Sequence, residues 1–255
     1  QQEPGIAAWL SNDQNMIDGY NSKDMYLHVP IKASILPTSA TQDTHPKERE
    51  LYKRALLATM YGQKEKSLSQ SLNIPIDHAA KLLSDIYSSY PKYFKWVAGV
   101  VSNSLRRGYM KTKFGWRRNL DYGDTINHRS LYNFPCQAHG GDMLRLALIL
   151  LTEKKFEINT LIHDGILLHV PRKKLEIKVL KIKKLMVDAA KITLGKGSKI
   201  RVDIKIIHNN FEQEAAEQIK FNRIMNKINE DVSVRNIGRV CTANYAPGLS
   251  SIMSS

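Results

Sequence analysis

The chain has 255 residues and carries 38 Lys and Arg against 24 Asp and Glu, a formal net charge of +14. Hydrophobic residues make up 42% of it, which excludes a disordered tail or a collagen-like fibre and predicts a sizeable folded core. The positive charge predicts a polyanionic partner, with nucleic acid favoured over an anionic membrane.

No apolar run reaches the roughly 18 residues that a membrane-spanning helix needs, and the start lacks the basic and apolar parts of a signal peptide. Cys136 and Cys241 are too few for a disulfide framework and lack metal-ligand spacing. We therefore expect an intracellular, reducing location, cytoplasmic or nucleoid-associated, with an organelle as the open alternative and no membrane contact.

The first half of the chain predicts helices separated by turn residues. Pro30, Pro37 and Pro46 indicate a loop-rich connection. Asp77 is expected to cap one helix and Pro91 to stop it. The helices expected in this half cover residues 5–10, 47–60, 68–72 and 77–90.

The second half predicts a hairpin over 108–123, a buried helix over 137–151 and an amphipathic basic helix over 173–191. Two apolar runs, expected to be buried strands, flank an Asp-Gly pair, which is a hairpin signal. Strict alternation of apolar and charged residues predicts a further, half-buried strand over 200–206. A helix rich in Glu and Gln is expected after Phe211. The pattern of hairpin, helix and strand indicates an α+β fold.

Four residues at a spacing of four lie along one face of the helix when it is taken over residues 49–61: Arg49, Lys53, Leu57 and Tyr61. Two cations one turn apart can bind successive phosphates of a polyphosphate, and the Leu and Tyr side chains can pack on a base or sugar. The alternative is a solvated charged face that becomes core toward the end of the helix.

Asp164 lies at the predicted hairpin tip, where a rigidly held carboxylate suits Mg²⁺. The alternative is that Asp-Gly simply makes the turn. Before the buried helix, Asn133 and Gln137 offer amides that can reach a minor groove, although Asn133 can equally cap that helix. The stretch 106–118 interleaves cations with aromatic rings, which suits phosphate contact and base stacking, or forms a solvated hairpin.

Taken in this order, the segments resemble the polymerase domain of family A DNA polymerases, the DNA polymerase I-like group. The run from Arg49 to Gly62 is similar to motif B of that family, a nucleotide-binding helix, and His163-Asp164 is similar to motif C. Gln1-Gln2-Glu3 resembles the end of motif A. The resemblance extends from residue 1 to about residue 211, and its other matching segments are 68–70, 74–75, 90–91, 108–118 and 129–137.

The resemblance implies a DNA-directed DNA polymerase that transfers deoxynucleotides to a primer 3′-hydroxyl with two Mg²⁺ ions. It implies that Asp164 is catalytic and binds the metal, and that Glu3 crowds a ribose 2′-hydroxyl. The implied nucleotide-binding residues are Arg49, Lys53, Leu57, Tyr61, Glu3 and Tyr26. The implied primer- and template-binding residues are Arg129, Asn133, Gln137, His163, Arg117 and Arg118.

The same resemblance implies a polymerase palm with an antiparallel sheet and a helical fingers subdomain. Palm would comprise 1–27 and 126–211, fingers 28–125, and residues 212–255 would form a C-terminal extension of unknown role. The implied partners are primer–template DNA and deoxynucleoside triphosphates, and the expected state is a monomer.

The chain departs from the family pattern at four places. The motif A Asp of the family stands three positions before Gln1, Leu57 replaces an aromatic residue, Gly165 replaces Glu, and Tyr26 replaces His. With one of two metal carboxylates, we expect these 255 residues alone to bind Mg²⁺ and nucleotide weakly and to be inactive.

Two other functions remain open at this point. Residues 68–85 resemble a helix-turn-helix DNA reader, although the exposed face of the second helix is nearly neutral. A single-subunit RNA polymerase is a distant relative of the same architecture, and both Glu3 and the run 137–139 disfavour it.

Overall fold

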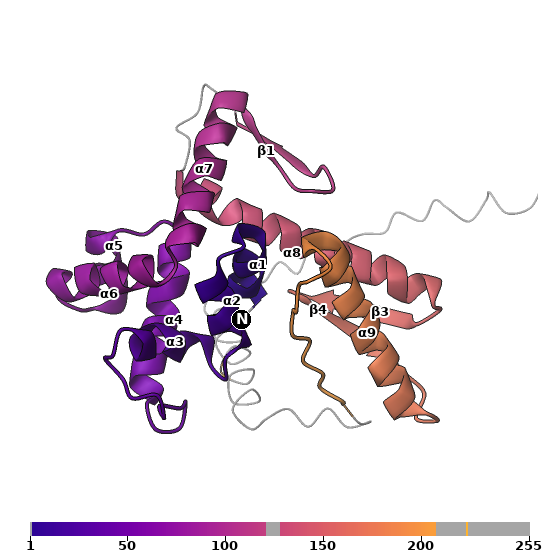
Figure 1. The fold of residues 1–255 in the computed structure, drawn as a ribbon. Coiled ribbons are helices and arrows are strands. Elements are labelled where there is room, and N and C mark those ends of the chain that lie inside the picture. The colour runs from indigo at the N-terminus through magenta and orange to yellow at the C-terminus, as the bar shows by residue number, and fades with distance from the viewer. Residues whose placement is uncertain (1, 121–127, 208–222, 224–255) are drawn as a thin grey trace, which may run out of the picture. The chain divides into compact units, whose positions relative to one another are not determined.

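The computed structural model describes residues 2–120, 128–207 and 223. The chain divides into two compact units, Gln1–Ile204 and Lys205–Ser255. The first unit contains the helices and strands described below, and the mixture of many helices with two small antiparallel sheets confirms the predicted α+β class (Figure 1). The helix expected after Phe211 lies outside the described residues.

Nine helices and four short strands form within the described residues. The helices are α1 (Gln2–Ser11), α2 (Gln14–Asn21), α3 (Met25–Lys32), α4 (Pro46–Met60), α5 (Glu65–Leu72), α6 (Ile76–Ser89), α7 (Pro91–Arg107), α8 (His128–Glu153) and α9 (Leu175–Leu194). The strands are β1 (Tyr109–Lys111), β2 (Arg117–Asn119), β3 (Glu157–Ile162) and β4 (Gly165–His169). Among the described residues, no helix combines the length and the apolar character needed to cross a membrane.

The core is built around α1, which contacts α2, α7, α8 and α9. A Cβ added at Gly5 would lie 2.6 Å from Cε2 of Tyr20, so only glycine permits this approach of α1 to α2. Asp13 caps α2 through the backbone of Met16 and also accepts the backbone N–H of Tyr93 at 2.9 Å. These contacts fix α1 and α2 against the start of α7.

The predicted helices 47–60 and 68–72 are confirmed as α4 and α5. Gly62, with a φ of +73°, lies in the turn that follows α4, where a left-handed conformation favours glycine. Pro30 was expected in a loop but lies inside α3, because most side chains of that helix are buried and tertiary packing supports it. Asp77 lies in the first turn of α6, whose N-cap residue is Pro75, so the predicted cap is wrong.

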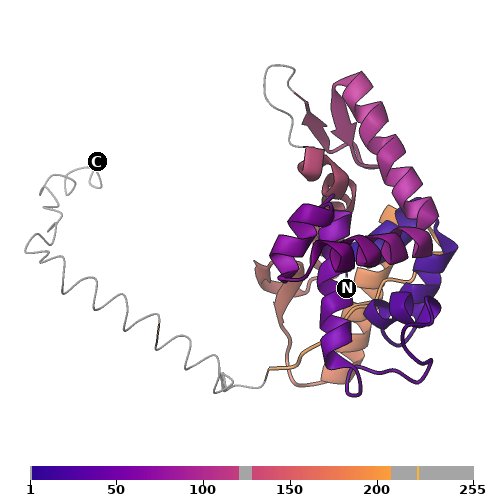
Figure 2. The same cartoon turned by 90° about the vertical axis from the view of Figure 1, so that its left-hand side faces the viewer.

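Pro91 begins α7 instead of merely ending the helix before it, since proline is well suited to the first helical position. α7 is absent from the predicted elements. Its buried residues, Tyr93, Val97, Val101 and Ser104, follow a helical spacing. Figures 1 and 2 show α7 projecting from the other helices with the β1–β2 hairpin at its far end.

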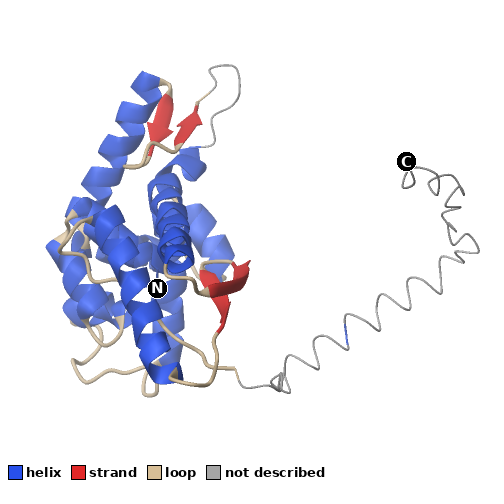
Figure 3. Cartoon of the chain, turned by 90° about the vertical axis from the view of Figure 1, so that its right-hand side faces the viewer, coloured by secondary structure: helices blue, strands red, loops and turns tan. Residues whose placement is uncertain are grey.

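Both predicted hairpins form, as the separate red strand pairs of Figure 3 show. The predicted burial of β3 is wrong, because Leu161 and Ile162 are 45% and 56% exposed. The strand predicted over 200–206 is also wrong: no strand is assigned to these residues. A strand requires a hydrogen-bonded neighbour, and within the described residues β3 and β4 pair only with each other.

The predicted helix 137–151 is longer than expected, since α8 begins at His128 and passes through Pro135. Asn133 therefore lies within α8 and does not cap it. α9 confirms the predicted basic helix and packs along α8 (Figure 1). α8 thus connects the centre of the fold to both hairpins, because β1–β2 packs near its start and β3–β4 follows its end.

Candidate nucleotide and primer–template site

Arg49 on α4 is held in place by α3. Its Nε donates to Oδ2 of Asp24, and its guanidinium carbon lies 5.3 Å from the centre of the Tyr26 ring. The other carboxylate oxygen of Asp24 accepts the backbone N–H of Tyr26 and so caps α3. Burial raises the pKa of the Tyr26 hydroxyl above 10. Asp24 therefore fixes the start of α3 and the direction of Arg49 together.

Lys53 lies one turn further along the same helix. Its ammonium is 3.1 Å from Oε2 of Glu50, and both side chains are exposed, so the ion pair is weak. Leu57 follows and is half-buried. The predicted face of α4 is therefore cationic and accessible at its start and more apolar toward its end.

Three residues from three distant parts of the chain meet at the end of α4. The Tyr61 hydroxyl donates to Oε1 of Glu3 at 3.0 Å, and Nε2 of Gln137 donates to the Tyr61 hydroxyl at 2.9 Å. Gln137 also reaches Oε1 of Glu3 at 3.3 Å. Burial, and then the charge of Glu3, raise the pKa of Tyr61, which keeps the hydroxyl protonated as a donor. We call these three residues the Glu3–Tyr61–Gln137 cluster.

α8 presents further polar groups next to this cluster. Asn133, one turn before Gln137, is 3% exposed, and its amide acts on the Tyr61 hydroxyl in the direction that lowers the pKa of that group. Arg129 is exposed and reaches the hydroxyl of Ser67 at 3.4 Å.

Asp164 lies at the tip of the β3–β4 hairpin. Ile162 pairs with Gly165, so His163 and Asp164 form the two-residue turn, with His163 at a φ of +54°. Both turn residues are exposed. The described part of the chain contains no group of three His, Cys, Asp or Glu that can hold a metal ion. Asp164 fits one carboxylate position of a Mg²⁺ site, and the described donors do not complete such a site.

The β1–β2 hairpin carries the predicted cations Arg117 and Arg118. Arg117 stacks on the ring of Tyr109 at 4.0 Å, and Arg118 donates to the hydroxyl of Ser130 at 3.1 Å. Trp116 lies over α8, where Arg145 stacks on its ring at 4.5 Å. The two Arg side chains lie on the hairpin and not in the Glu3–Tyr61–Gln137 cluster.

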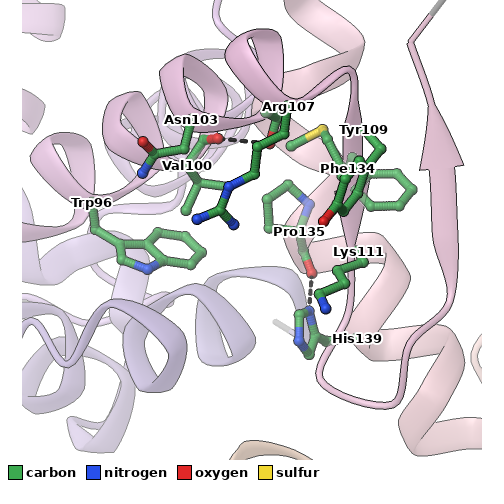
Figure 4. Close-up of a pocket in the computed structure, with 11 residues that line it drawn as sticks. Trp96, Val100, Asn103, Arg107, Tyr109, Lys111, Phe134, Pro135 and His139 are labelled. Atoms are coloured by element: carbon green, nitrogen blue, oxygen red, sulfur yellow. Dashed lines mark hydrogen bonds between the residues drawn. The ribbon is translucent and has the colours of Figure 1, made fainter.

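A cavity of about 200 Å³ lies between α7, β1 and α8 (Figure 4). His139 on its wall is buried, and burial lowers its pKa below 6.5. Its Nδ1 bonds to the carbonyl of Pro135 at 2.7 Å, and its Nε2 accepts the backbone N–H of Lys113 at 3.2 Å. Neutral His139 thus ties the hairpin loop to α8. The other residues lining the cavity include Trp96, Asn103, Arg107, Tyr109 and Lys111.

α5 and α6 are consecutive helices that contact each other, as the helix-turn-helix alternative requires. Its exposed face carries Asp77 and His78, and Lys81 pairs with Asp85 at 3.3 Å. This face is close to neutral, so it lacks the positive charge that phosphate contact requires.

The predicted residues therefore form three groups. Glu3, Tyr61 and Gln137 contact one another, with Asn133 one helical turn away on α8, and Arg49 contacts Tyr26. Asp164 makes no hydrogen bond or ion pair with a described residue, and no such bond links it to the cluster. The sequence does not predict Asp24 or His139 as site residues, because a lone Asp before a short helix and a lone His inside a long helix give no spacing signal.

Comparison with known proteins identifies the family of this chain. The model of DNA polymerase family A matches residues 1–212. The thermostable DNA polymerase I of Thermus thermophilus is 28% identical over 188 residues, which cover 69% of this chain and 22% of that protein. The DNA polymerase I of Bacillus caldotenax is 25% identical over 189 residues, 69% of this chain and 21% of the relative.

A solved structure shares the fold. It is described as the POL domain of Pol1 from M. smegmatis in complex with DNA primer-template and dNTP, and it matches with a TM-score of 0.66 and 24% identity over 74% of this chain and 35% of the other. This chain spans about a fifth of the length of the curated relatives that it matches. Because the family model covers most of its residues, the chain belongs to DNA polymerase family A.

Proposed function

We propose that this chain is part of a DNA-directed DNA polymerase, an enzyme that adds deoxynucleotides to a primer 3′-hydroxyl under the direction of a DNA template. The observation that carries the proposal is the Glu3–Tyr61–Gln137 cluster, which joins three positions far apart in sequence that the family resemblance assigns to nucleotide and DNA binding. Relatives named DNA polymerase I support it.

Arg49 and Lys53 bind the triphosphate in this proposal. Asp24 engages Nε of Arg49, and neither Nη group of Arg49 makes a hydrogen bond to a described residue. Two free donors on a fixed guanidinium suit bidentate binding of phosphate oxygens. Lys53, whose only ion pair among the described residues is with exposed Glu50, adds a mobile charge one turn away. Together they stabilise the negative charge that develops on the leaving pyrophosphate.

The cluster and its neighbours position sugar and bases. Glu3 is held by Tyr61 and Gln137, so its carboxylate occupies a defined position where it can exclude a ribose 2′-hydroxyl. In this proposal the exposed Gln137, and Asn133 one turn before it on α8, donate amide N–H groups to minor-groove N3 and O2 atoms, which are acceptors. Leu57 packs on the incoming nucleotide, and Tyr26, stacked against Arg49, lines the triphosphate side.

Asp164 is the catalytic carboxylate and a Mg²⁺ ligand in this proposal. When bound, Mg²⁺ supplies positive charge at the reacting phosphate and lowers the pKa of a coordinated hydroxyl. His163, Arg129, Arg117 and Arg118 contact the primer or template. In domain terms, residues 1–27 and 126–211 are palm, 28–125 are fingers, and 212–255 are an extension.

The test is template-directed nucleotide selection, measured without turnover. A fluorescent primer–template ends in a dideoxynucleotide, and its binding to the chain is followed by anisotropy with each dNTP in turn. Because these residues are expected to bind Mg²⁺ and nucleotide weakly, both are titrated up to the highest concentrations that the assay allows. Within that range only the dNTP complementary to the next template base should tighten the complex, in the presence of Mg²⁺, while the matching rNTP should not. If all four dNTPs act alike, or the rNTP acts as well as the dNTP, the proposal of a DNA polymerase site is wrong.

Two substitutions locate the effect. Lys53→Ala should remove most of the increase in affinity that the complementary dNTP causes. It should leave binding of the primer–template alone nearly unchanged, because Lys53 contacts only the triphosphate in this proposal. Lys81→Ala removes an equal charge from the exposed face of α6 and is the matched control. Equal losses in both variants would show that charge alone, and not a triphosphate site on α4, produces the effect.

A further inference from the structure

The β1–β2 hairpin exposes aromatic rings among cations. Residues 106–118 contain six Lys and Arg and no Asp or Glu. Phe114, next to the turn glycine, is 49% exposed, and Trp116 is 44% exposed. Accessible aromatic rings among cations suit the stacking of bases together with phosphate contact, and the uniform charge indicates that the partner is a polyanion.

The loop that carries the two rings is held by hydrogen bonds. Thr112 is buried, and its hydroxyl accepts the backbone N–H of Trp116 at 3.1 Å, which closes the loop together with Gly115 at a φ of +88°. His139 fixes the backbone of Lys113 to α8. A platform that is already ordered loses little conformational entropy when a ligand stacks on it.

The Trp116 ring is supported from α8. Arg145 stacks on it at 4.5 Å, and the Phe134 ring lies 5.9 Å away at 48°. Arg145 is itself oriented by buried Asp142 at 2.9 Å, which neutralises part of its charge. The cations that remain at the hairpin include Arg117 and Lys111, both exposed.

We propose that Trp116 and Phe114 form a stacking platform for single-stranded DNA, which in the polymerase is the unpaired template strand. Duplex DNA offers cations its phosphates but hides the faces of its bases, whereas a single strand offers both phosphates and bases. Charge complementarity therefore selects a nucleic acid, and the exposed rings select an unpaired strand. The identification of that strand as template rests on the proposed function.

Binding of labelled oligo(dT) tests the platform, with a blunt hairpin duplex of equal phosphate count as the second ligand. Trp116→Ala should weaken oligo(dT) binding by roughly 5- to 150-fold, the range of one lost base–aromatic stack, and leave duplex binding nearly unchanged. Trp116→Phe should retain most of the affinity. Oligo(dT) should also quench tryptophan fluorescence in the unmodified chain but much less in Trp116→Phe.

Phe114→Ala is a second variant, in case Trp116→Ala disturbs folding. Its side chain is half-exposed at the hairpin tip and can be removed without opening the core, and its loss should also weaken oligo(dT) binding. Tyr87→Ala, which removes another exposed ring from α6, is the matched control. The proposal is overturned if both hairpin variants bind oligo(dT) like the unmodified chain, or if they lose single-strand and duplex binding equally. Its failure is separable from that of the proposed function, since tightening by the complementary dNTP is measured independently.

Discussion

The end of α4 and the β3–β4 hairpin are held in place by different means. Glu3, Tyr61 and Gln137 are fixed by side-chain hydrogen bonds between three helical segments. Asp164 depends on the backbone of a two-stranded hairpin with exposed apolar residues, an arrangement that is marginal without further packing. Side-chain hydrogen bonds within the described residues therefore prearrange the proposed nucleotide side of the site. On the proposed metal side, the described residues provide the turn that carries Asp164 and no further metal-binding group.

The largest expected effect tests the metal side. Asp164→Ala should abolish the Mg²⁺-dependent part of the tightening by complementary dNTP, because the variant lacks the proposed metal ligand. The free energy of unfolding should change by no more than about 0.5 kcal/mol, since Asp164 is exposed and makes no bond to a described residue. Mg²⁺ titration of the anisotropy signal and thermal unfolding measure the two effects. Asp43→Ala, an exposed loop carboxylate, should change neither, and unchanged Mg²⁺ dependence in Asp164→Ala would remove Asp164 from the site.

The next effect concerns Arg49, which Asp24 holds on the nucleotide side. Asp24→Ala should lower the free energy of unfolding by about 1–3 kcal/mol, because it removes both the helix cap and a charged hydrogen bond to Arg49. Asp24→Asn keeps the cap and should lose less stability, yet it should still weaken dNTP binding because Arg49 is no longer oriented. Chemical denaturation and the dNTP titration separate the two roles. If Asp24→Asn binds dNTP normally, Asp24 is only a cap.

The sequence predicted the parts of the fold that rest on local signals. The spacing of four predicted Arg49 on α4 and Tyr61 next to its end, where the structure has Tyr61 as the C-cap residue, and Asp-Gly predicted the β3–β4 hairpin. Partners distant in sequence could not be predicted from such signals, so the Asp24–Arg49 ion pair was missed. The strand over 200–206 failed for the converse reason, because alternation shows which face can be buried and not whether a neighbouring strand exists.

The meeting of Glu3 with Gln137 could not follow from spacing either, since 134 residues separate them. The family resemblance assigns Glu3 to nucleotide binding and Gln137 to primer–template binding, and the structure joins the two by a hydrogen bond. Local signals also gave a wrong boundary at Asn133. A polar residue before an apolar helix is a reasonable cap, but α8 begins five residues earlier, so Asn133 lies inside the helix.

A smaller effect is expected inside the cluster itself. Tyr61→Phe removes the hydroxyl that joins Glu3 to Gln137 and should cost about 0.5–1.5 kcal/mol of unfolding free energy. Because Glu3 is then held less firmly, the preference for dNTP over rNTP should also fall. Competition between the two nucleotides in the anisotropy assay measures this preference. Tyr87→Phe removes a tyrosine hydroxyl from α6, outside the cluster, as the control. An unaltered sugar preference in Tyr61→Phe would mean that Glu3 needs no such support.

The smallest effect is a pH dependence that arises away from both regions compared above. Burial is the main cause that lowers the pKa of His139 below 6.5, Lys113 acts in the same direction, and Asp142 and the Pro135 carbonyl oppose it. As the pH falls below 6.5, the unfolded chain therefore takes up a proton before the folded chain does. The stabilisation from neutral His139 is fully present above pH 6.5 and is lost as the pH falls toward the lower pKa of the folded state.

Protonation of His139 would also convert Nε2 from an acceptor into a donor, which breaks its bond to the backbone of Lys113 and frees the β1–β2 loop. Thermal unfolding midpoints between pH 8 and pH 5 should therefore fall more in the unmodified chain than in His139→Gln, which cannot titrate. Burial also lowers the pKa of His28, which is present in both proteins. His28 therefore accounts for the part of the decrease in unfolding midpoint that both proteins show. Parallel profiles for the two proteins would show that the hairpin is held to α8 by Trp116 and the apolar core beneath it, and not by His139.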